Sequence, residues 1–121
     1  MESNKADPYV VLRLGMEERR TRYKDDAGGT LVVFNEVLSF SKRLQDNLLR
    51  IQVLDKDTHT DDLMGELDVD LTKNELPPGG QSERPVPFEM LLKGKPAGKV
   101  LFFFKIFQHV FATFAPARTL K

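Results

Sequence analysis

Residues 47–71 read NLLRIQVLDKDTHTDDLMGELDVDL, two apolar segments separated by a strongly acidic octet. The segments 47–55 and 63–71 are rich in Val, Leu and Ile, and neither sustains the spacing of an amphipathic helix. The octet 55–62 contains four Asp, two Thr, one Lys and one His, and turns favour Asp and Thr. This stretch therefore predicts two β-strands that are joined by an acidic loop.

The same pattern extends over most of the chain. Further segments rich in apolar residues alternate with stretches that carry the glycine or proline of turns, such as DDAGG (25–29) and KGKPAG (93–98). Together with the first two, the predicted strands are residues 9–15, 19–24, 31–41, 47–55, 63–71, 85–91 and 98–107. Short strands with regular turn signals are typical of an all-β sandwich.

Length, net charge and cysteine content limit the number of domains, the class of partner and the compartment that we expect. A chain of 121 residues is predicted to form a single domain over residues 1–121. Lys plus Arg equals Asp plus Glu at 18 each, so net charge does not favour nucleic acid as a partner. The chain has no cysteine, and its polar start, MESNKADP, lacks an apolar signal region. We therefore expect a cytoplasmic domain.

The acidic octet raises an electrostatic question. Asp55 and Asp57 are two residues apart at a strand end, a spacing that sends both carboxylates to one side. Two such charges at about 4 Å repel by about 1 kcal/mol in water and about 4 kcal/mol at an effective dielectric of about 20. A cation would offset this, and calcium prefers such oxygen ligands, with Asp7 as a candidate from a second loop. The alternative is a solvated hairpin turn.

Three stretches taken together identify a family. ADPYVVLRLG (6–15), VFNEVLSF (33–40) and LRIQVLDKDTHTDDLMGE (49–66) resemble the C2 domain family of calcium- and phospholipid-binding β-sandwiches. The resemblance implies an eight-stranded antiparallel sandwich with binding loops at one end. It also implies a non-enzymatic, calcium-dependent module that targets anionic phospholipid membranes in signalling and trafficking and that is peripheral at membranes.

The resemblance also implies a set of calcium ligands. By position they are Asp7, Asp55, Asp57 and Asp62, with Asp61 as a shifted substitute for the last. The family's first aspartate falls at Met1, and the nearest acid is Glu2. Calcium (Ca2+) is thus the expected cofactor, with one ligand of the family pattern missing.

The family's first strand has no counterpart at the N-terminus, whereas VFATFAPARTL (110–120) resembles it. Two topologies follow. Either the sandwich is circularly permuted, with residues 110–115 as the last strand, or the missing strand comes from elsewhere. In the second case an exposed sheet edge invites dimerisation or strand swapping.

Two further surfaces suggest partners. Arg20, Arg22 and Lys24 alternate and so share one face of a predicted strand, which the resemblance implies is a basic patch for lipid head groups; an ordinary solvated face is the alternative. Strand 98–107 is apolar on both faces, so either the tail 109–121 covers it or a protein partner or second copy does. The alternative function is a calcium-independent C2 domain that binds a protein or phosphoinositide.

Overall fold

The structure, a computed structural model, describes residues 6–24, 31–43, 45–73, 82 and 84–108. All regular secondary structure in these ranges is β-strand, which confirms the predicted all-β class. The strands are β1 (Pro8–Leu14), β2 (Glu17–Arg20), β3 (Leu31–Lys42), β4 (Leu48–Asp55), β5 (Asp62–Asp70), β6 (Val86–Leu92) and β7 (Lys95–Gln108). These ranges contain no helix that is long and apolar enough to cross a membrane.

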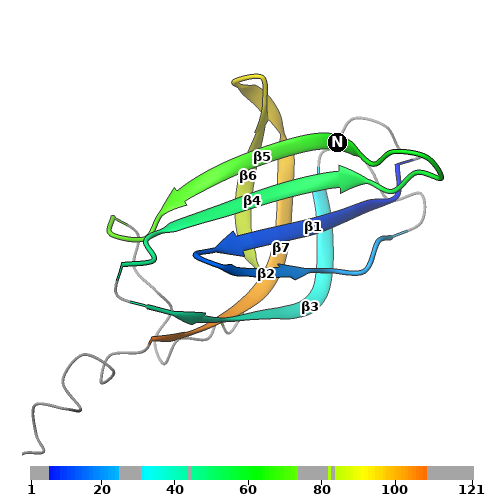
Figure 1. The fold of residues 1–121 in the computed structure, drawn as a ribbon. Helices are drawn as coiled ribbons and strands as arrows, with labels where there is room; N and C mark the ends of the chain where they lie inside the picture. The colour runs from blue at the N-terminus through cyan, green and yellow to red at the C-terminus, as the bar shows by residue number, and fades with distance from the viewer. Residues whose placement is uncertain (1–5, 25–30, 44, 74–81, 83, 109–121) are drawn as a thin grey trace, which may run out of the picture.

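The seven strands form one folded sheet in the order β2-β1-β4-β5-β6-β7-β3. Figure 1 shows that β2, β1, β4 and β5 lie side by side in one layer, while β6, β7 and β3 form the second layer and run in a different direction. The layers are joined where β5 pairs with β6, and this ladder is short: its register consists of Glu66 opposite Leu91. Beyond that pair the two strands diverge.

The hydrophobic core lies between the layers. In β7 the alternate residues Val100, Phe102, Phe104 and Ile106 are all buried, because a period of two sends them to one face. From the other layer, the buried residues of β4 are Leu49, Ile51 and Val53. Phe88 of β6 stacks on Phe102, with the ring centroids 5.1 Å apart.

The second apolar face of the strand predicted at 98–107 is partly covered. Leu101 and Phe103 are half-buried, whereas Val100 and Phe102 on the inner face are completely buried. The tail 109–121, predicted to cover the outer face, lies outside the described residues. Its role as cover, and the alternative of a protein partner or homodimer, stay predictions.

One strand pair differs from the expected antiparallel arrangement. β3 and β7 pair in parallel, from Leu31 opposite Lys99 to Lys42 opposite Gln108, with a register shift between Val33 and Val37. Alternation along a strand predicts which side chains are buried, but it contains no information on the direction of the neighbouring strand. Residues 110–115, the predicted eighth strand, lie outside the described residues, so both predicted topologies stay open.

The strand predicted at 19–24 is shorter than expected and ends at Arg20. The next residues lie beside β1 without forming a regular ladder: the amide N–H groups of Thr21 and Lys24 donate to β1 carbonyls at 2.9 and 3.0 Å. The predicted placement of Arg20, Arg22 and Lys24 on one strand is therefore wrong, because only Arg20 belongs to β2. Their role as a basic patch for lipid head groups stays a prediction.

Candidate functional site

The predicted calcium ligands lie at the end of the sandwich where β4 ends and β5 begins. The amide N–H of Asp7 donates to Oδ1 of Asp55 at 2.9 Å, and the N–H of Lys56 donates to the carbonyl oxygen of Asp7 at 3.0 Å. Asp62 is exposed and lies opposite Asp55 in the β4–β5 ladder. The strand pairing thus brings Asp7, Asp55 and Asp62 to one edge.

The other two predicted ligands, Asp57 and Asp61, hold the loop in shape. The N–H of Asp57 donates to Oδ1 of Asp61 at 3.0 Å, and Oδ2 of Asp61 accepts a hydrogen bond from the hydroxyl of Tyr9 at 2.5 Å. Oδ1 of Asp57 accepts from the N–H and the hydroxyl of Thr58 at 2.6 and 3.2 Å. Asp57 does not continue the strand alternation that was predicted to aim it beside Asp55, because β4 ends at Asp55.

These carboxylates do not converge on one point. The part of the chain that the structure describes contains no group of three or more acidic or imidazole side chains placed to hold a metal ion. Calcium takes about 6–8 oxygen ligands, whereas Asp57 and Asp61 direct their oxygens to hydrogen-bond donors of the loop and of Tyr9. In this arrangement the residues do not fit a calcium site, and the ligand set stays a prediction.

Next to the acidic loop lies a hollow of about 470 Å³ with a cationic lining. It is assembled from the start of β1, the end of β2 with the segment that follows, and the β4–β5 loop. The described residues that line it are Tyr9, Arg20, Thr21, Arg22, Tyr23, Lys56 and Asp61. Three basic residues and one acidic residue thus face the same space, which we call the cationic pocket.

The three basic residues of the pocket differ in the ion pairs and hydrogen bonds that their side chains form. Arg20 forms an ion pair with Glu18 at 3.0 Å, a hydrogen bond that raises the pKa of Arg20, and its guanidinium lies 5.8 Å from the Tyr9 ring centroid. Lys56 lies 3.9 Å from Asp61. The guanidinium of Arg22 forms no ion pair or hydrogen bond with the residues that the structure describes. Arg22 is therefore the cation most available to a ligand.

The acidic member of the pocket is ionised at neutral pH. The N–H of Asp57, and next the hydroxyl of Tyr9, lower the pKa of Asp61 because both stabilise the carboxylate. Burial, followed by the hydrogen bond to Asp61, raises the pKa of Tyr9, so its phenol stays protonated and donates. The pocket therefore contains a fixed negative charge among its positive charges.

Sequence reasoning found part of this pocket. Arg20 and Arg22 line it as part of the predicted basic patch, but Lys24 does not: its Nζ donates to the carbonyl oxygen of Val33. Tyr9 and Lys56 were missed as lining residues. Both lie in the stretches that resemble the C2 family, residues 6–15 and 49–66. Only the β1–β4 register, with Tyr9 opposite Leu54, brings them together.

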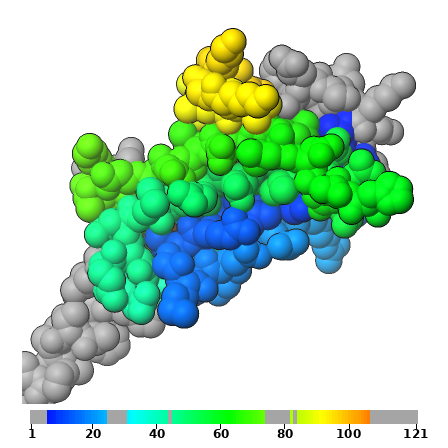
Figure 2. All heavy atoms as spheres, turned by 45° about the horizontal axis from the view of Figure 1, so that its top comes forward, coloured from blue at the N-terminus to red at the C-terminus, as the bar shows by residue number. Residues whose placement is uncertain are grey.

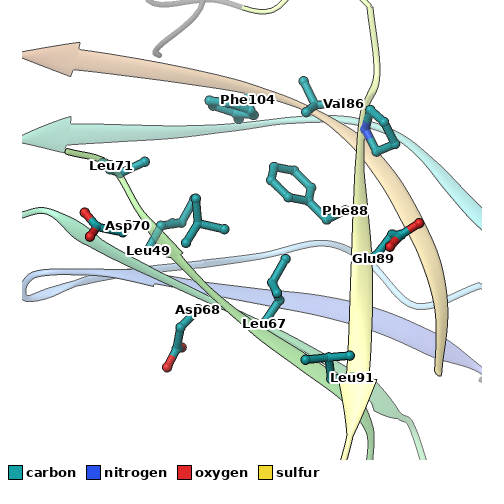
Figure 3. A pocket seen from close by; sticks show the side chains of 12 residues that line it. Leu49, Leu67, Asp68, Asp70, Leu71, Val86, Phe88, Glu89, Leu91 and Phe104 are labelled. Atoms are coloured by element: carbon teal, nitrogen blue, oxygen red, sulfur yellow. The ribbon is translucent and has the colours of Figure 1, made fainter. Parts of the chain in front are cut away.

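A second, larger hollow lies between the diverging strands β5 and β6 (Figure 3). It has a volume of about 720 Å³, and we call it the apolar groove. The described residues that line it are Leu49, Leu67, Asp68, Val69, Asp70, Leu71, Val86, Pro87, Phe88, Glu89, Leu91 and Phe104. Its charged members are all acidic, so it does not suit an anionic ligand.

Comparisons with known proteins assign the family. The family model for the C2 domain matches residues 1–87, and the chain belongs to the C2 domain family. It is 39% identical over 73 residues to Multiple C2 domain and transmembrane region protein 6 of Arabidopsis thaliana, covering 59% of this chain and 7% of that protein. It is also 35% identical over 66 residues to GTPase activating protein 1 of Oryza sativa subsp. indica, covering 54% of this chain and 39% of that protein.

A solved structure supports the fold. A C2 domain of plant Extended Synaptotagmin 1 superposes with a TM-score of 0.52 at 15% identity, covering 84% of this chain and 80% of that one. The predicted C2-type β-sandwich is thereby confirmed as the fold. C2 domains of this kind generally bind phospholipid membranes and are generally non-enzymatic modules. The matched region is a small part of the Arabidopsis relative, 7% of its length, so the activity of that whole protein does not transfer to this chain.

Proposed function

We propose that this chain is a peripheral membrane-targeting module that binds anionic phospholipid through the cationic pocket. The observation that carries the proposal is the convergence of Arg20, Arg22 and Lys56, from separate segments, on one hollow. The role is attachment to a surface, without a catalytic step. The negatively charged cytoplasmic face of membranes is the surface that such a pocket suits.

The chemistry of the lining supports phosphate as the recognised group. An arginine guanidinium presents donors in a planar fork that matches phosphate oxygens, and Arg22 has this fork available. The half-exposed Tyr23 adds a phenol hydroxyl at the same hollow. Each basic residue near an anionic membrane contributes about 1 kcal/mol, so three give weak binding of about 3 kcal/mol. Such binding falls as salt rises.

Calcium dependence is a separate and finer proposal. It is supported by the resemblance and by the hydrogen bond between Asp7 and Asp55, with Asp62 opposite Asp55 in the ladder. Its ligands are the predicted set, Asp7, Asp55, Asp57 and Asp62, with Asp61 as substitute. Calcium binding would require Asp57 and Asp61 to leave the hydrogen bonds described above, and a bound ion would then offset the repulsion among the carboxylates.

Vesicle sedimentation tests both proposals. Phosphatidylcholine vesicles with and without phosphatidylserine are mixed with the protein in excess chelator, and the assay is repeated with calcium. We expect binding to the anionic vesicles in chelator, weakened by added salt, and none to neutral vesicles. If the protein binds anionic vesicles neither in chelator nor in calcium, the proposed function is wrong. If calcium increases the binding of the wild type and Asp55→Asn abolishes this increase, the calcium proposal is supported. If calcium leaves the binding of the wild type unchanged, the calcium proposal is wrong.

A further inference from the structure

The carboxylate of Asp61 lies in the lining of the cationic pocket, among its basic residues. It is the acidic residue among the described lining residues, and its side chain is 22% exposed. Lys56 lies 3.9 Å away, and the Tyr9 hydroxyl donates to Oδ2. The groups that hold Asp61 are thus the groups that a phosphate oxygen would need.

The position of Asp61 is fixed by the fold rather than by the pocket alone. The N–H of Asp57 holds Oδ1 from within the loop, while Tyr9, buried at the start of β1, holds Oδ2 from the sheet. The carboxylate is therefore tied on both oxygens. A ligand that enters the pocket must either displace Asp61 from Tyr9 and Lys56 or bind beside its charge.

The neighbouring Asp62 provides an internal comparison. It carries the same charge and is adjacent in sequence, but it is the first residue of β5, is exposed and does not line the pocket. Removing either carboxylate changes the net charge equally. Any difference in ligand affinity between variants at the two residues therefore reflects the position of the carboxylate rather than the total charge.

We propose that Asp61 is a built-in competitor that lowers the affinity of the cationic pocket for phosphate-bearing head groups. This inference rests on the proposed function, since it assigns a regulating residue to the same site. Its consequence is that the pocket binds more weakly than its three basic residues would allow. A change that moves the β4–β5 loop away from Tyr9 would strengthen binding.

The test compares Asp61→Asn with Asp62→Asn in chelator. The first probe is phosphatidylcholine vesicles that contain phosphatidylserine, and the second is free inositol hexakisphosphate, which separates a membrane surface from phosphate alone. Asparagine keeps the size of aspartate and a carbonyl oxygen that accepts from Asp57, so the loop should persist. Asp61→Asn should bind about tenfold more tightly than the wild type, about 1.4 kcal/mol, because a unit charge next to the ligand is removed. In chelator, where the calcium that Asp62 is proposed to bind is absent, Asp62→Asn should change affinity much less, because Asp62 does not line the pocket.

The outcomes separate the inference from the proposed function. Equal gains for both variants would overturn the inference, since net charge alone would then explain them, and so would an unchanged or weaker affinity of Asp61→Asn. If no protein binds vesicles, the proposed function fails, while the inositol hexakisphosphate arm still tests whether Asp61 competes with phosphate. Should Asp61→Asn unfold, Asp61→Ser provides a neutral side chain with a hydroxyl that can still accept from Asp57. The same result is expected of it.

Discussion

The cationic pocket and the apolar groove lie at opposite ends of the β4–β5 ladder and arise in different ways. The pocket adjoins Asp55 and Asp62, which are paired at one end, whereas the groove includes Leu49 and Val69, paired near the other. The groove exists because β5 and β6 separate after a single register pair. The pocket exists because three separate segments bring charges together.

The larger hollow is therefore not the better candidate for function. The groove, at about 720 Å³, is bordered by the hydrophobic core and by carboxylates, and it extends the packing of Phe88 on Phe102. The smaller pocket, at about 470 Å³, holds Arg22, the cation whose side chain has no partner among the described residues. The two regions should respond differently to mutation. Changes at the groove should lower the stability of the fold, whereas changes at the pocket should weaken binding to anionic vesicles.

The largest effect is expected for Phe102→Ala, which removes the ring that supports Phe88 of the groove. Phe102 is completely buried, so the change should lower the free energy of unfolding by about 3–5 kcal/mol. Urea unfolding followed by circular dichroism measures it. Met16→Ala, at a residue that is 91% exposed, is the control and should change little. Equal stability of the two variants, or a vesicle affinity of folded Phe102→Ala below that of the wild type, would contradict this division of roles.

The next effect concerns binding. Replacing Arg22 and Lys56 together by glutamine should weaken binding to anionic vesicles about 30-fold, since each basic residue contributes about 1 kcal/mol. The control replaces Lys93 and Lys95 by glutamine, because they lie at the exposed β6–β7 hairpin, which projects above the surface of β4 and β5 in yellow in Figure 2. An equal loss in both double variants would mean that the whole surface, not the pocket, attracts the membrane.

A smaller effect is expected at the junction of the two layers. A Cβ on Gly65 would lie 2.9 Å from the Cβ of Met90, which is completely buried and cannot move freely. Gly65→Ala should therefore cost about 1–2 kcal/mol of stability through overpacking, without changing vesicle binding. Thermal unfolding measures the cost. A melting temperature equal to that of the wild type would show that β5 and β6 are less closely packed than described.

The smallest effect is expected for Lys24→Gln. The amino group of Lys24 donates to the carbonyl of Val33 and does not line the pocket, so vesicle affinity should fall by less than about twofold. Arg22→Gln alone should cost about fivefold, the equivalent of about 1 kcal/mol. If the two single variants lose affinity equally, the basic patch predicted from sequence alternation describes the surface better than the pocket does.

Local sequence pattern was sufficient for the all-β class, for most of the strands and for the position of the acidic loop. Alternation along residues 98–107 divided the apolar side chains between two faces, and the structure buries the one with Val100, Phe102 and Phe104. The motif around Asp55 identified the loop and the family. These features depend on the sequence period and on short motifs, both of which are visible in one chain.

Pairing between distant segments was not predictable in the same way. The parallel pairing of β3 with β7, and the meeting of Tyr9 with Asp61, depend on which strands become neighbours and in what register. The alternation of Arg20 with Lys24 suggested one strand face, but β2 ends before Lys24. Asp61 accepts hydrogen bonds from Tyr9 and Asp57, contacts that the sequence did not indicate, and its role as a substitute calcium ligand stays a prediction.

The most direct test of the central claim locates the ligand on the protein. Amide NMR spectra are recorded while a water-soluble, short-chain phosphatidylserine is added in the presence of chelator. The cationic pocket predicts that the largest shifts occur at Tyr9, Arg22, Lys56 and Asp61, with little change at the groove residues Val69 and Phe88. Shifts centred on the groove, or no shifts at the pocket at saturating lipid, would contradict the account.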